Sequence, residues 1–244
     1  MLKKFLYKLR TDLKQLFNFP VCHWANDKSI DYSSYWKVRS KKGKDDLALS
    51  DWQKERADIV LGFVKKDSSV IDLGCGNGAV LNYFKNKANI KGIGVDVSSQ
   101  VLEKAKQNGL QTVVADISNS EELKKLPKAD FVTAFELLEH VPSSENLLHN
   151  LEKIAKQGIV FSVPNTGYYL HRLRLLFGRF PLQWIAHPGE HLRFWTKKDM
   201  CSWLGQQNFN YELNMYQGLP GLKKIWSSLF AQGMLIYIKL DKND

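Results

Sequence analysis

The sequence has few cysteines and no long apolar run. Cys22, Cys75 and Cys201 lie far apart and are odd in number, so they form neither a disulfide framework nor a metal-binding spacing. We therefore expect a reducing, cytoplasmic environment. No stretch of about 18 apolar residues is present, so no transmembrane helix is expected. Charges interrupt the apolar residues near the start, which argues against a secretory signal.

Glycine and proline are also scarce, and acidic residues are outnumbered by basic ones. With 16 glycines and 7 prolines in 244 residues, long disordered segments are not expected. A hydrophobic content of 44% is enough for the core of one α/β domain. The net charge of +10 favours anionic partners, which include nucleic acid, phosphate-bearing metabolites and anionic membrane surfaces. The charge alone does not choose among them.

The most informative stretch is residues 69–79, which read S-V-I-D-L-G-C-G-N-G-A. Its apolar start predicts a buried strand, and a helix is expected to follow a turn of three glycines, Gly74, Gly76 and Gly78. A strand, a glycine turn and a helix N-terminus can hold part of a nucleotide. The glycines fit a dinucleotide fingerprint, which is a weak signal alone. Asp72 would repel a pyrophosphate but suits a ligand that carries a cation.

Acidic residues also end the strands that follow this turn. The strand predicted over 91–96 ends in Asp96. Its distance in sequence from the glycines is about that at which a carboxylate reaches the ribose hydroxyls of a bound nucleotide. The strand predicted over 112–117 contains Asp116. Further strands are predicted over 129–135 and 158–163, and helical stretches alternate with them. This order predicts a doubly wound α/β sheet whose ligands bind at the carboxyl ends of the strands.

The run Asp72–Gly78 resembles the D-x-G-x-G-x-G signature of class I methyltransferases that depend on S-adenosylmethionine (SAM), in their small-molecule branch. This resemblance implies a Rossmann-like seven-stranded sheet, with five parallel strands, a C-terminal antiparallel hairpin and helices on both faces. It implies that Asp72 faces the ammonium of SAM, Asp96 the ribose and Asp116 the adenine. The cofactor-binding residues that it implies are Arg39, Asp72, Gly74, Cys75, Gly76, Gly78, Asp96, Val97, Asp116, Ile117, Phe135 and Glu136.

The chain is expected to have three parts. Residues 1–20 predict a basic amphipathic helix, which either packs on its own domain or a dimer partner, or contacts an anionic membrane through residues 2–17. Residues 21–46 are either a solvated basic linker or a segment that covers the cofactor with Tyr35, Trp36 or Arg39. Residues 47–244 form the methyltransferase domain, with a substrate cap at about 164–195.

The predicted fourth strand leads into E-L-L-E-H-V, residues 136–141. On a helix, Glu136, Glu139 and His140 would share one face. The run resembles the E-x-x-E-H-V of ubiquinone-type O-methyltransferases. His140 is a candidate general base for a hydroxyl. A structural histidine and a divalent-cation site remain alternatives, and the sequence alone assigns no metal ligand. The run N/D-P-P-Y/F and the Pro-Cys pair, which mark nucleic-acid methyltransferases, are absent, so no nucleic-acid partner is expected.

The predicted cap is rich in arginine, histidine and aromatic residues. Its S-V-P-N-x-G and R-L-x-L-L-F-G runs, and the H-L-x-x-W-T-K-x-D pattern that follows, are similar to the methionine-biosynthesis protein MetW and its polysaccharide-cluster relatives. His187, His191 and Arg193 are the candidates for contacting the acceptor, and the two histidines join His140 as catalytic candidates. Three further arginines could bind an anionic group or lie on a solvated helix face: Arg172, Arg174 and Arg179. Near the end, a helix is predicted over 222–230 with Trp226 in the core.

These patterns predict an enzyme that transfers a methyl group from SAM to a small molecule. The favoured acceptor is a hydroxyl of a sugar, a glycan precursor or a quinone-like lipid, with polysaccharide biosynthesis as a setting. One alternative is a MetW-like protein that binds a partner acyltransferase, and another is an RNA methyltransferase. The enzyme is expected in the cytoplasm, with peripheral contact at the inner membrane face through residues 2–17. The oligomeric state is not predicted.

Overall fold

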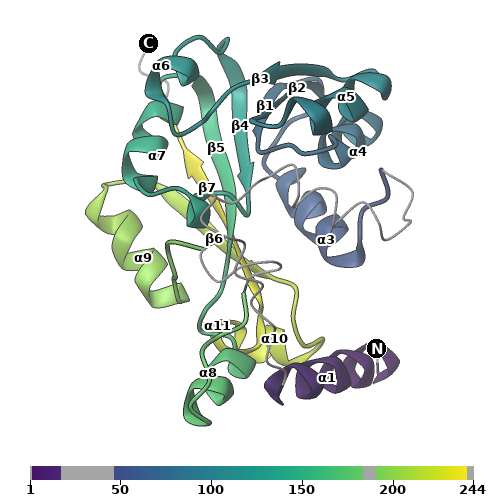
Figure 1. Cartoon of the computed structure of the whole chain (residues 1–244), viewed down its shortest axis with the longest axis vertical. Coiled ribbons are helices and arrows are strands. Elements are labelled where there is room, and N and C mark those ends of the chain that lie inside the picture. Colours follow the sequence, from purple (N-terminus) through teal and green to yellow (C-terminus); the bar gives the residue numbers. More distant parts are fainter. Residues whose placement is uncertain (1, 18–46, 184–190, 241–244) are drawn as a thin grey trace, which may run out of the picture.

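The computed structural model describes residues 2–17, 47–183 and 191–240, and its centre is a seven-stranded sheet (Figure 1). The strand order is β3-β2-β1-β4-β5-β7-β6. The first five strands of this order are parallel, and β7 runs antiparallel to both of its neighbours, which confirms the predicted sheet. The strands are β1 (Ser69–Leu73), β2 (Lys91–Asp96), β3 (Gln111–Val114), β4 (Ala129–Phe135), β5 (Ala155–Pro164), β6 (Tyr211–Tyr216) and β7 (Gly233–Lys239).

Helices cover both faces of the sheet, as the doubly wound prediction requires (Figure 1). On one face, α3 (Asp51–Val60), α4 (Ala79–Ala88) and α5 (Ser99–Gln107) bury apolar residues such as Val60, Phe84 and Leu102 against the strands. On the other face, α6 (Ser120–Leu123), α7 (Ser144–Glu152) and α9 (Lys197–Gln206) do the same with Leu123, Leu148 and Met200. The sheet is thus buried on both sides, and its carboxyl edge is left for ligands.

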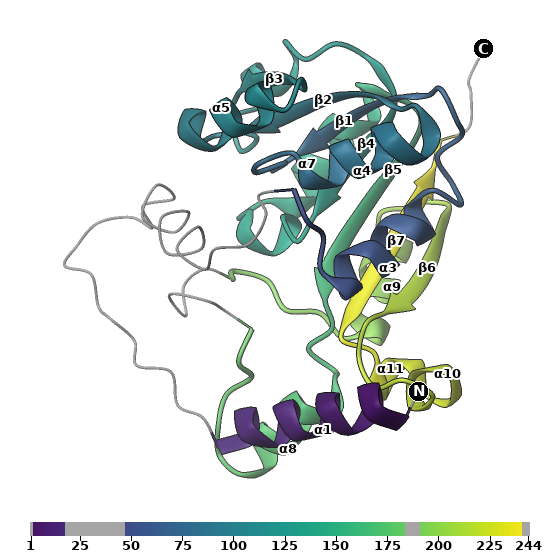
Figure 2. The same cartoon turned by 90° about the vertical axis from the view of Figure 1, so that its right-hand side faces the viewer.

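A further group of helices lies beyond one end of the sheet, at the bottom of Figures 1 and 2. This group contains α1 (Leu2–Phe17), α8 (Tyr169–Leu176), α10 (Leu222–Ile225) and α11 (Ser227–Phe230). α1 packs on α8, where Leu16, Tyr168 and Leu170 form a small core of their own. The Tyr169 and Phe230 rings lie 5.7 Å apart, which joins α8 to α11. None of the helices in the described residues combines the length and the apolar composition that a membrane-spanning helix needs.

The structure corrects several predicted boundaries. The helix expected over 222–230 is two short helices that meet at Trp226, whose φ of −137° is not helical. Trp226 is 57% exposed, so its predicted place in the core is wrong. β3 ends at Val114, before the acid that was expected to end it. The capping box of Thr196 and Asp199 starts α9, as the side chain of Thr196 predicts.

Candidate active site at the carboxyl ends of the strands

The glycine turn after β1 depends on backbone angles that other residues rarely adopt. Its three glycines have φ values of 66°, 55° and 78° at Gly74, Gly76 and Gly78 respectively. A side chain at Gly78 would also meet Leu110 at 2.3 Å. The turn delivers the chain into α4, so backbone N–H groups at the helix start face the carboxyl edge of the sheet. The arrangement confirms the strand, turn and helix that the sequence predicts here.

Asp72 is buried at the carboxyl half of β1, directly below the glycine turn. The hydroxyl of Thr133 on β4 donates a 2.6 Å hydrogen bond to its Oδ1. Burial raises the pKa of Asp72 to about 7, although the Thr133 bond and the charge of Arg56 oppose the rise. The protein therefore surrounds this carboxylate with less positive charge than its ionised form needs. A ligand with an ammonium group would supply that charge, as the sequence interpretation requires.

Asp96 is tied to the glycine turn, whereas Asp116 is not. Gly76 N donates to Asp96 Oδ2 over 3.0 Å, and Ser98 N donates to Oδ1 over 2.9 Å. Burial raises the pKa of Asp96, and these backbone bonds oppose the rise. Asp116 is exposed and accepts from the backbone and hydroxyl of Ser118, so it orders the loop after β3. The side chains of Val97 and Ile117 follow these two acids at the same edge of the sheet.

Glu136 is held by residues that the sequence gives no reason to place beside it. It follows β4 with a φ of 50°, a strained value for a residue with a side chain. Its Oε1 accepts from Ser162 Oγ at 2.7 Å and from Tyr216 OH at 2.8 Å. Arg56 on α3 places Nη1 3.7 Å from the same oxygen and lies over the Phe135 ring. These partners are 26 to 80 residues away in sequence, so no local pattern indicates them.

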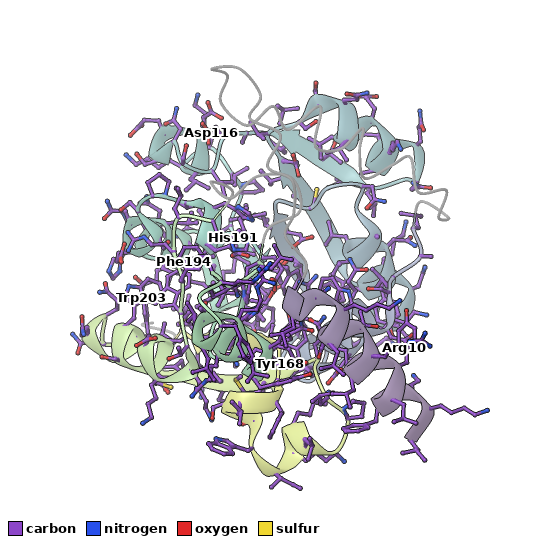
Figure 3. The ribbon with its side chains drawn as sticks, turned by 60° about the horizontal axis from the view of Figure 1, so that its bottom comes forward. Arg10, Asp116, Tyr168, His191, Phe194 and Trp203 are labelled. Carbon is purple, nitrogen blue, oxygen red and sulfur yellow. The ribbon has the colours of Figure 1, made fainter. Side chains whose placement is uncertain are left out.

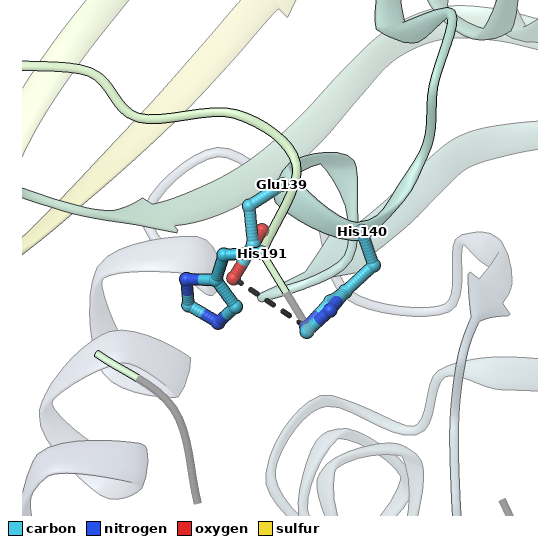
Figure 4. Close-up of side chains that lie close together, drawn as sticks. All are labelled: Glu139, His140 and His191. Carbon is cyan, nitrogen blue, oxygen red and sulfur yellow. Dashed lines mark ion pairs between the residues drawn. The ribbon is translucent and has the colours of Figure 1, made fainter. Parts of the chain in front are cut away.

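The predicted shared face of Glu136, Glu139 and His140 is not formed. Residues 138–140 are a short 3-10 helix, η1, and Glu136 precedes it in a different backbone conformation. Instead, Glu139 and His140 meet His191 of the cap, and one ligand atom from each lies within 4.8 Å of the others (Figure 4). The backbone fixes this meeting, because Leu192 N donates to the carbonyl oxygen of Glu139 over 2.7 Å.

The Glu139 cluster, by which we mean Glu139, His140 and His191, contains a carboxylate without a hydrogen bond. Both Glu139 oxygens are buried and unpartnered among the described residues, and its pKa is raised well above the usual value by burial and by Glu136. His140 Nε2 lies 4.0 Å from Glu139 Oε1. Burial and His140 lower the pKa of His191 to about 4, which keeps that imidazole neutral. Two imidazole groups and a carboxylate are a ligand set for a divalent cation.

Beside Glu136, a small polar cavity connects the sheet edge to the cap. Its lining includes His171 of α8, Gln217 and Gln232, and Pro164 at the end of β5. Burial lowers the pKa of His171 to about 4, so this ring is neutral as well. Carboxylate, amide and neutral imidazole groups can together bind hydroxyl groups of an acceptor.

Arg193, which was expected to contact the acceptor, and two of the arginines that could bind an anionic group make contacts within the protein. Arg193 donates to the carbonyl oxygen of Pro142 over 2.5 Å and pairs with Glu145 at 3.3 Å, so it fastens the cap to α7. The guanidinium of Arg174 is bound to backbone carbonyl groups of α1 and of residue 180. Arg172 is exposed and donates to the Gly167 carbonyl oxygen. Arg39 and His187 lie outside the described residues.

Comparison with known proteins gives a family for most of the chain. A family model described as a methyltransferase domain matches residues 47–214. The ubiquinone biosynthesis O-methyltransferase of Haemophilus ducreyi is 28% identical over 170 residues, which are 64% of this chain and 72% of that protein. The protein of the same name from Pseudoalteromonas translucida is 32% identical over 154 residues, 57% of this chain and 62% of that one.

Solved structures share the fold. A SAM-dependent methyltransferase from Archaeoglobus fulgidus has a TM-score of 0.60 at 19% identity and covers 84% of this chain and 99% of its own. The magnesium protoporphyrin IX methyltransferase of Synechocystis was solved with bound S-adenosylhomocysteine. It has a TM-score of 0.59 at 16% identity, and the match covers 86% of this chain and 95% of that one. At these identities the likeness concerns the architecture alone.

Proposed function

The chain belongs to the methyltransferase-domain family and is a class I SAM-dependent methyltransferase, and from this premise we propose that it methylates a hydroxyl group of a small molecule. The observation that carries the proposal is the Glu139 cluster at the end of β4. The cluster follows β4, the strand that pairs with β1 beside the glycine turn. A quinone-like phenol is the first acceptor to test, because the curated relatives are named ubiquinone biosynthesis O-methyltransferases.

In this proposal the residues around β1 and β2 bind the cofactor. Asp72 takes the ammonium group, since its carboxylate is buried without enough positive charge around it. Asp96 accepts from ribose hydroxyls while its existing bonds to Gly76 and Ser98 hold it still. Asp116 and Ile117 border the adenine, and Val97 lies beside the ribose. When bound, SAM supplies a methyl group that its sulfonium has already activated, so positioning and exclusion of water account for most of the rate.

The Glu139 cluster would hold a divalent cation. The residues fit such an ion because both Glu139 oxygens lack a hydrogen bond within the described chain and two imidazoles lie within reach. A cation there would add positive charge beside the acceptor hydroxyl and lower its pKa. Without a cation, His140 is the stronger candidate to receive the hydroxyl proton, because the lowered pKa of His191 makes that ring a weak base.

The cavity beside Glu136 is our candidate for binding the acceptor itself. Glu136 is held by Ser162, Tyr216 and Arg56, so its orientation is fixed before any acceptor arrives. Gln217 and Gln232 add amide groups to the same lining. Fixed polar groups in a small cavity orient a ligand at low entropic cost.

The experiment is transfer of a labelled methyl group from SAM to catechol, after chelation and after adding back Mg²⁺ or Mn²⁺. We expect methylation of oxygen, loss of activity on chelation, and recovery with the ion. Glu139→Gln should behave as the chelated protein, while Glu121→Gln, an exposed change on α6, should behave as the wild type. Methylation that survives both chelation and Glu139→Gln would contradict the cation and favour His140 acting as a base. Labelled product on an amine instead of a hydroxyl would contradict the acceptor class.

A further inference from the structure

An exposed apolar surface runs across the helices at one end of the molecule. We call it the basal face and define it as the outward surfaces of α1, α8, α10 and α11 (Figure 2). Leu176 is 77% exposed and Ile225 is 85% exposed, and they belong to segments that are far apart in sequence. Monomeric proteins rarely gather so many large apolar side chains on one surface. Its exposed members include Leu2, Leu6, Leu13, Leu175, Leu176 and Ile225, with Trp226 between α10 and α11.

α1 is fixed in place on this face. Asp12 is fully buried and accepts from Tyr168 OH at 2.6 Å, Tyr169 OH at 2.9 Å and Lys8 Nζ at 2.7 Å. Arg174 also donates to carbonyl groups at the carboxyl end of α1. Figure 3 shows Tyr168 where α8 meets α1. A helix held by such buried polar contacts presents one defined side outward.

The outward side of α1 is itself divided into apolar and basic strips. Leu2, Leu6 and Leu13 are spaced by four and seven residues, so they align along one strip of the helix. All three are more than half exposed. The packed side contains Asp12 and Leu16. By the same helical spacing, Lys3, Arg10 and Lys14 form a basic strip next to the leucines.

Positive charge is concentrated on the same face. Residues 2–17, 168–180 and 219–231 together contain ten lysines and arginines and one acid. That acid is Asp12, which is buried and already bonded. Ten basic residues and one acid give these segments a net charge of +9, although Arg174 is buried and Lys4 and Lys223 pair with Asp51 and Glu55 outside the segments.

From this combination we propose that the basal face docks on an anionic phospholipid bilayer. Exposed leucine, isoleucine and tryptophan side chains enter the interfacial region, and the lysines and arginines beside them pair with lipid phosphates. Charge complementarity selects the anionic membrane, since nucleic acid would leave the leucines of α1 in water. This inference goes beyond the methylation chemistry, which needs no membrane.

The position of α8 gives this docking a consequence. α8 contributes Leu175 and Leu176 to the basal face and His171 to the cavity beside Glu136. One short helix therefore separates the proposed membrane surface from the proposed acceptor site. A bilayer on this face would bring a lipid-carried acceptor next to the cavity.

Vesicle flotation tests the proposal with the full chain. Vesicles of phosphatidylcholine alone are compared with vesicles of equal parts phosphatidylcholine and phosphatidylglycerol. We expect the protein to float with the anionic vesicles only, and high salt to weaken this binding. Equal flotation with both vesicle types, or with neither, would overturn the proposal.

Matched variants separate the basal face from general charge. Replacing Lys3, Arg10 and Lys14 with Gln should weaken binding to anionic vesicles about a hundredfold. The control variant replaces Lys65, Lys66 and Lys156 with Gln, which removes the same charge elsewhere. Its binding to anionic vesicles should change less than about twofold. Equal losses in the two triple variants would overturn the assignment of the face.

A third variant tests the apolar strip, with Leu2, Leu6 and Leu13 replaced by Ser. These side chains are exposed, so we expect unchanged SAM binding and thermal unfolding but lost flotation. If the wild type instead forms a dimer in sedimentation that this variant disperses, and flotation is unchanged, the face binds a second copy and the membrane proposal fails.

Discussion

The two halves of the site are assembled in different ways. The cofactor half, residues 69–98, is made of consecutive elements, and Asp96 bonds to Gly76 within it, while the hydrogen bond to Asp72 described above comes from the more distant Thr133 on the neighbouring strand β4. The acceptor half joins residues 136–140 to the cap, and its contacts span 26 to 80 residues, as from Glu136 to Ser162 and Tyr216. The difference teaches that a local motif positions the cofactor, while tertiary packing positions the acceptor.

Both halves nevertheless have one electrostatic feature in common. Each contains a buried carboxylate that lacks a cation, Asp72 in the cofactor half and Glu139 in the acceptor half, and burial raises the pKa of both. Such groups cost folding free energy unless a ligand supplies the missing charge. We infer that an organic ammonium completes the first and a divalent cation the second. The predictions that follow change one half and read out the other.

The largest effect is expected from Glu139→Gln. The variant should lose methyl transfer by at least about a hundredfold, because an essential group of the acceptor half is gone. The affinity for SAM, measured by titration calorimetry, should change less than about twofold. A change of this size is no larger than that of an ordinary surface substitution. Unfolding stability should not fall, since the Glu139 carboxylate makes no hydrogen bond with the described residues. A parallel loss of SAM binding would show that the halves are not separable.

Asp72→Asn should act on the cofactor half instead. We expect SAM affinity to fall about a hundredfold because the partner of the ammonium loses its charge. The folded pKa near 7 lies above the ordinary value of 3.8, so ionising Asp72 lowers the stability of the ligand-free protein as pH rises from about 4 to about 7. The variant should be more stable than the wild type at about pH 8 in thermal unfolding. A less stable variant at that pH would contradict this account.

Asp12→Ala tests whether α1 is needed for either half. Removing this carboxylate leaves the Tyr168 and Tyr169 hydroxyls without their acceptor, which should cost about 3 kcal/mol of unfolding free energy. Arg10→Ala, on the exposed side of the same helix, should cost less than about 0.5 kcal/mol. SAM binding should stay unchanged in both variants. Denaturant unfolding measures the difference, and equal stabilities would contradict the buried role of Asp12.

Tyr216→Phe should have the smallest effect. It removes one of the hydrogen bonds to Glu136 Oε1 and leaves the Ser162 bond in place, so we expect a loss of about 1 kcal/mol in stability. Turnover should decrease by less than tenfold. The KM for the acceptor should increase more than the KM for SAM. A change in the KM for SAM alone would contradict this account and assign Glu136 to the cofactor half.

The cofactor half is largely predictable from the sequence because its physical requirements are local. Three glycines with positive φ, a carboxylate before them and an acid at the next strand end all fall within residues 72–96. The parallel strands follow from the alternation of elements, and the sheet confirms them together with the antiparallel C-terminal hairpin that the resemblance implies. Asp116 lies after the end of β3, not within the strand as predicted, and it orders the loop around Ser118.

The acceptor half was not predictable to the same degree. The sequence makes His140 and His191 catalytic candidates but does not show that they meet at Glu139, because a backbone hydrogen bond from Leu192 to Glu139 makes that contact. Arg193 resembles an acceptor-binding residue in sequence, yet it binds Glu145 and a backbone carbonyl group. An arginine's partner, whether a ligand or the end of a helix, depends on tertiary packing. The spacing of residues in the sequence does not predict that packing.

The central claim is that Asp72 holds the cationic cofactor, and titration calorimetry of SAM against pH tests it most directly. Affinity is measured at about pH 5.5 and at about pH 7. Both pH values are below the pKa of an α-amino group, so the ammonium of SAM stays charged at each. We predict that the wild type binds SAM about tenfold more tightly at the higher pH, because Asp72 must give up its proton to bind. Asp72→Asn should bind weakly and equally at both. Wild-type affinity that is independent of pH, or a variant that binds as tightly as the wild type, would contradict the claim.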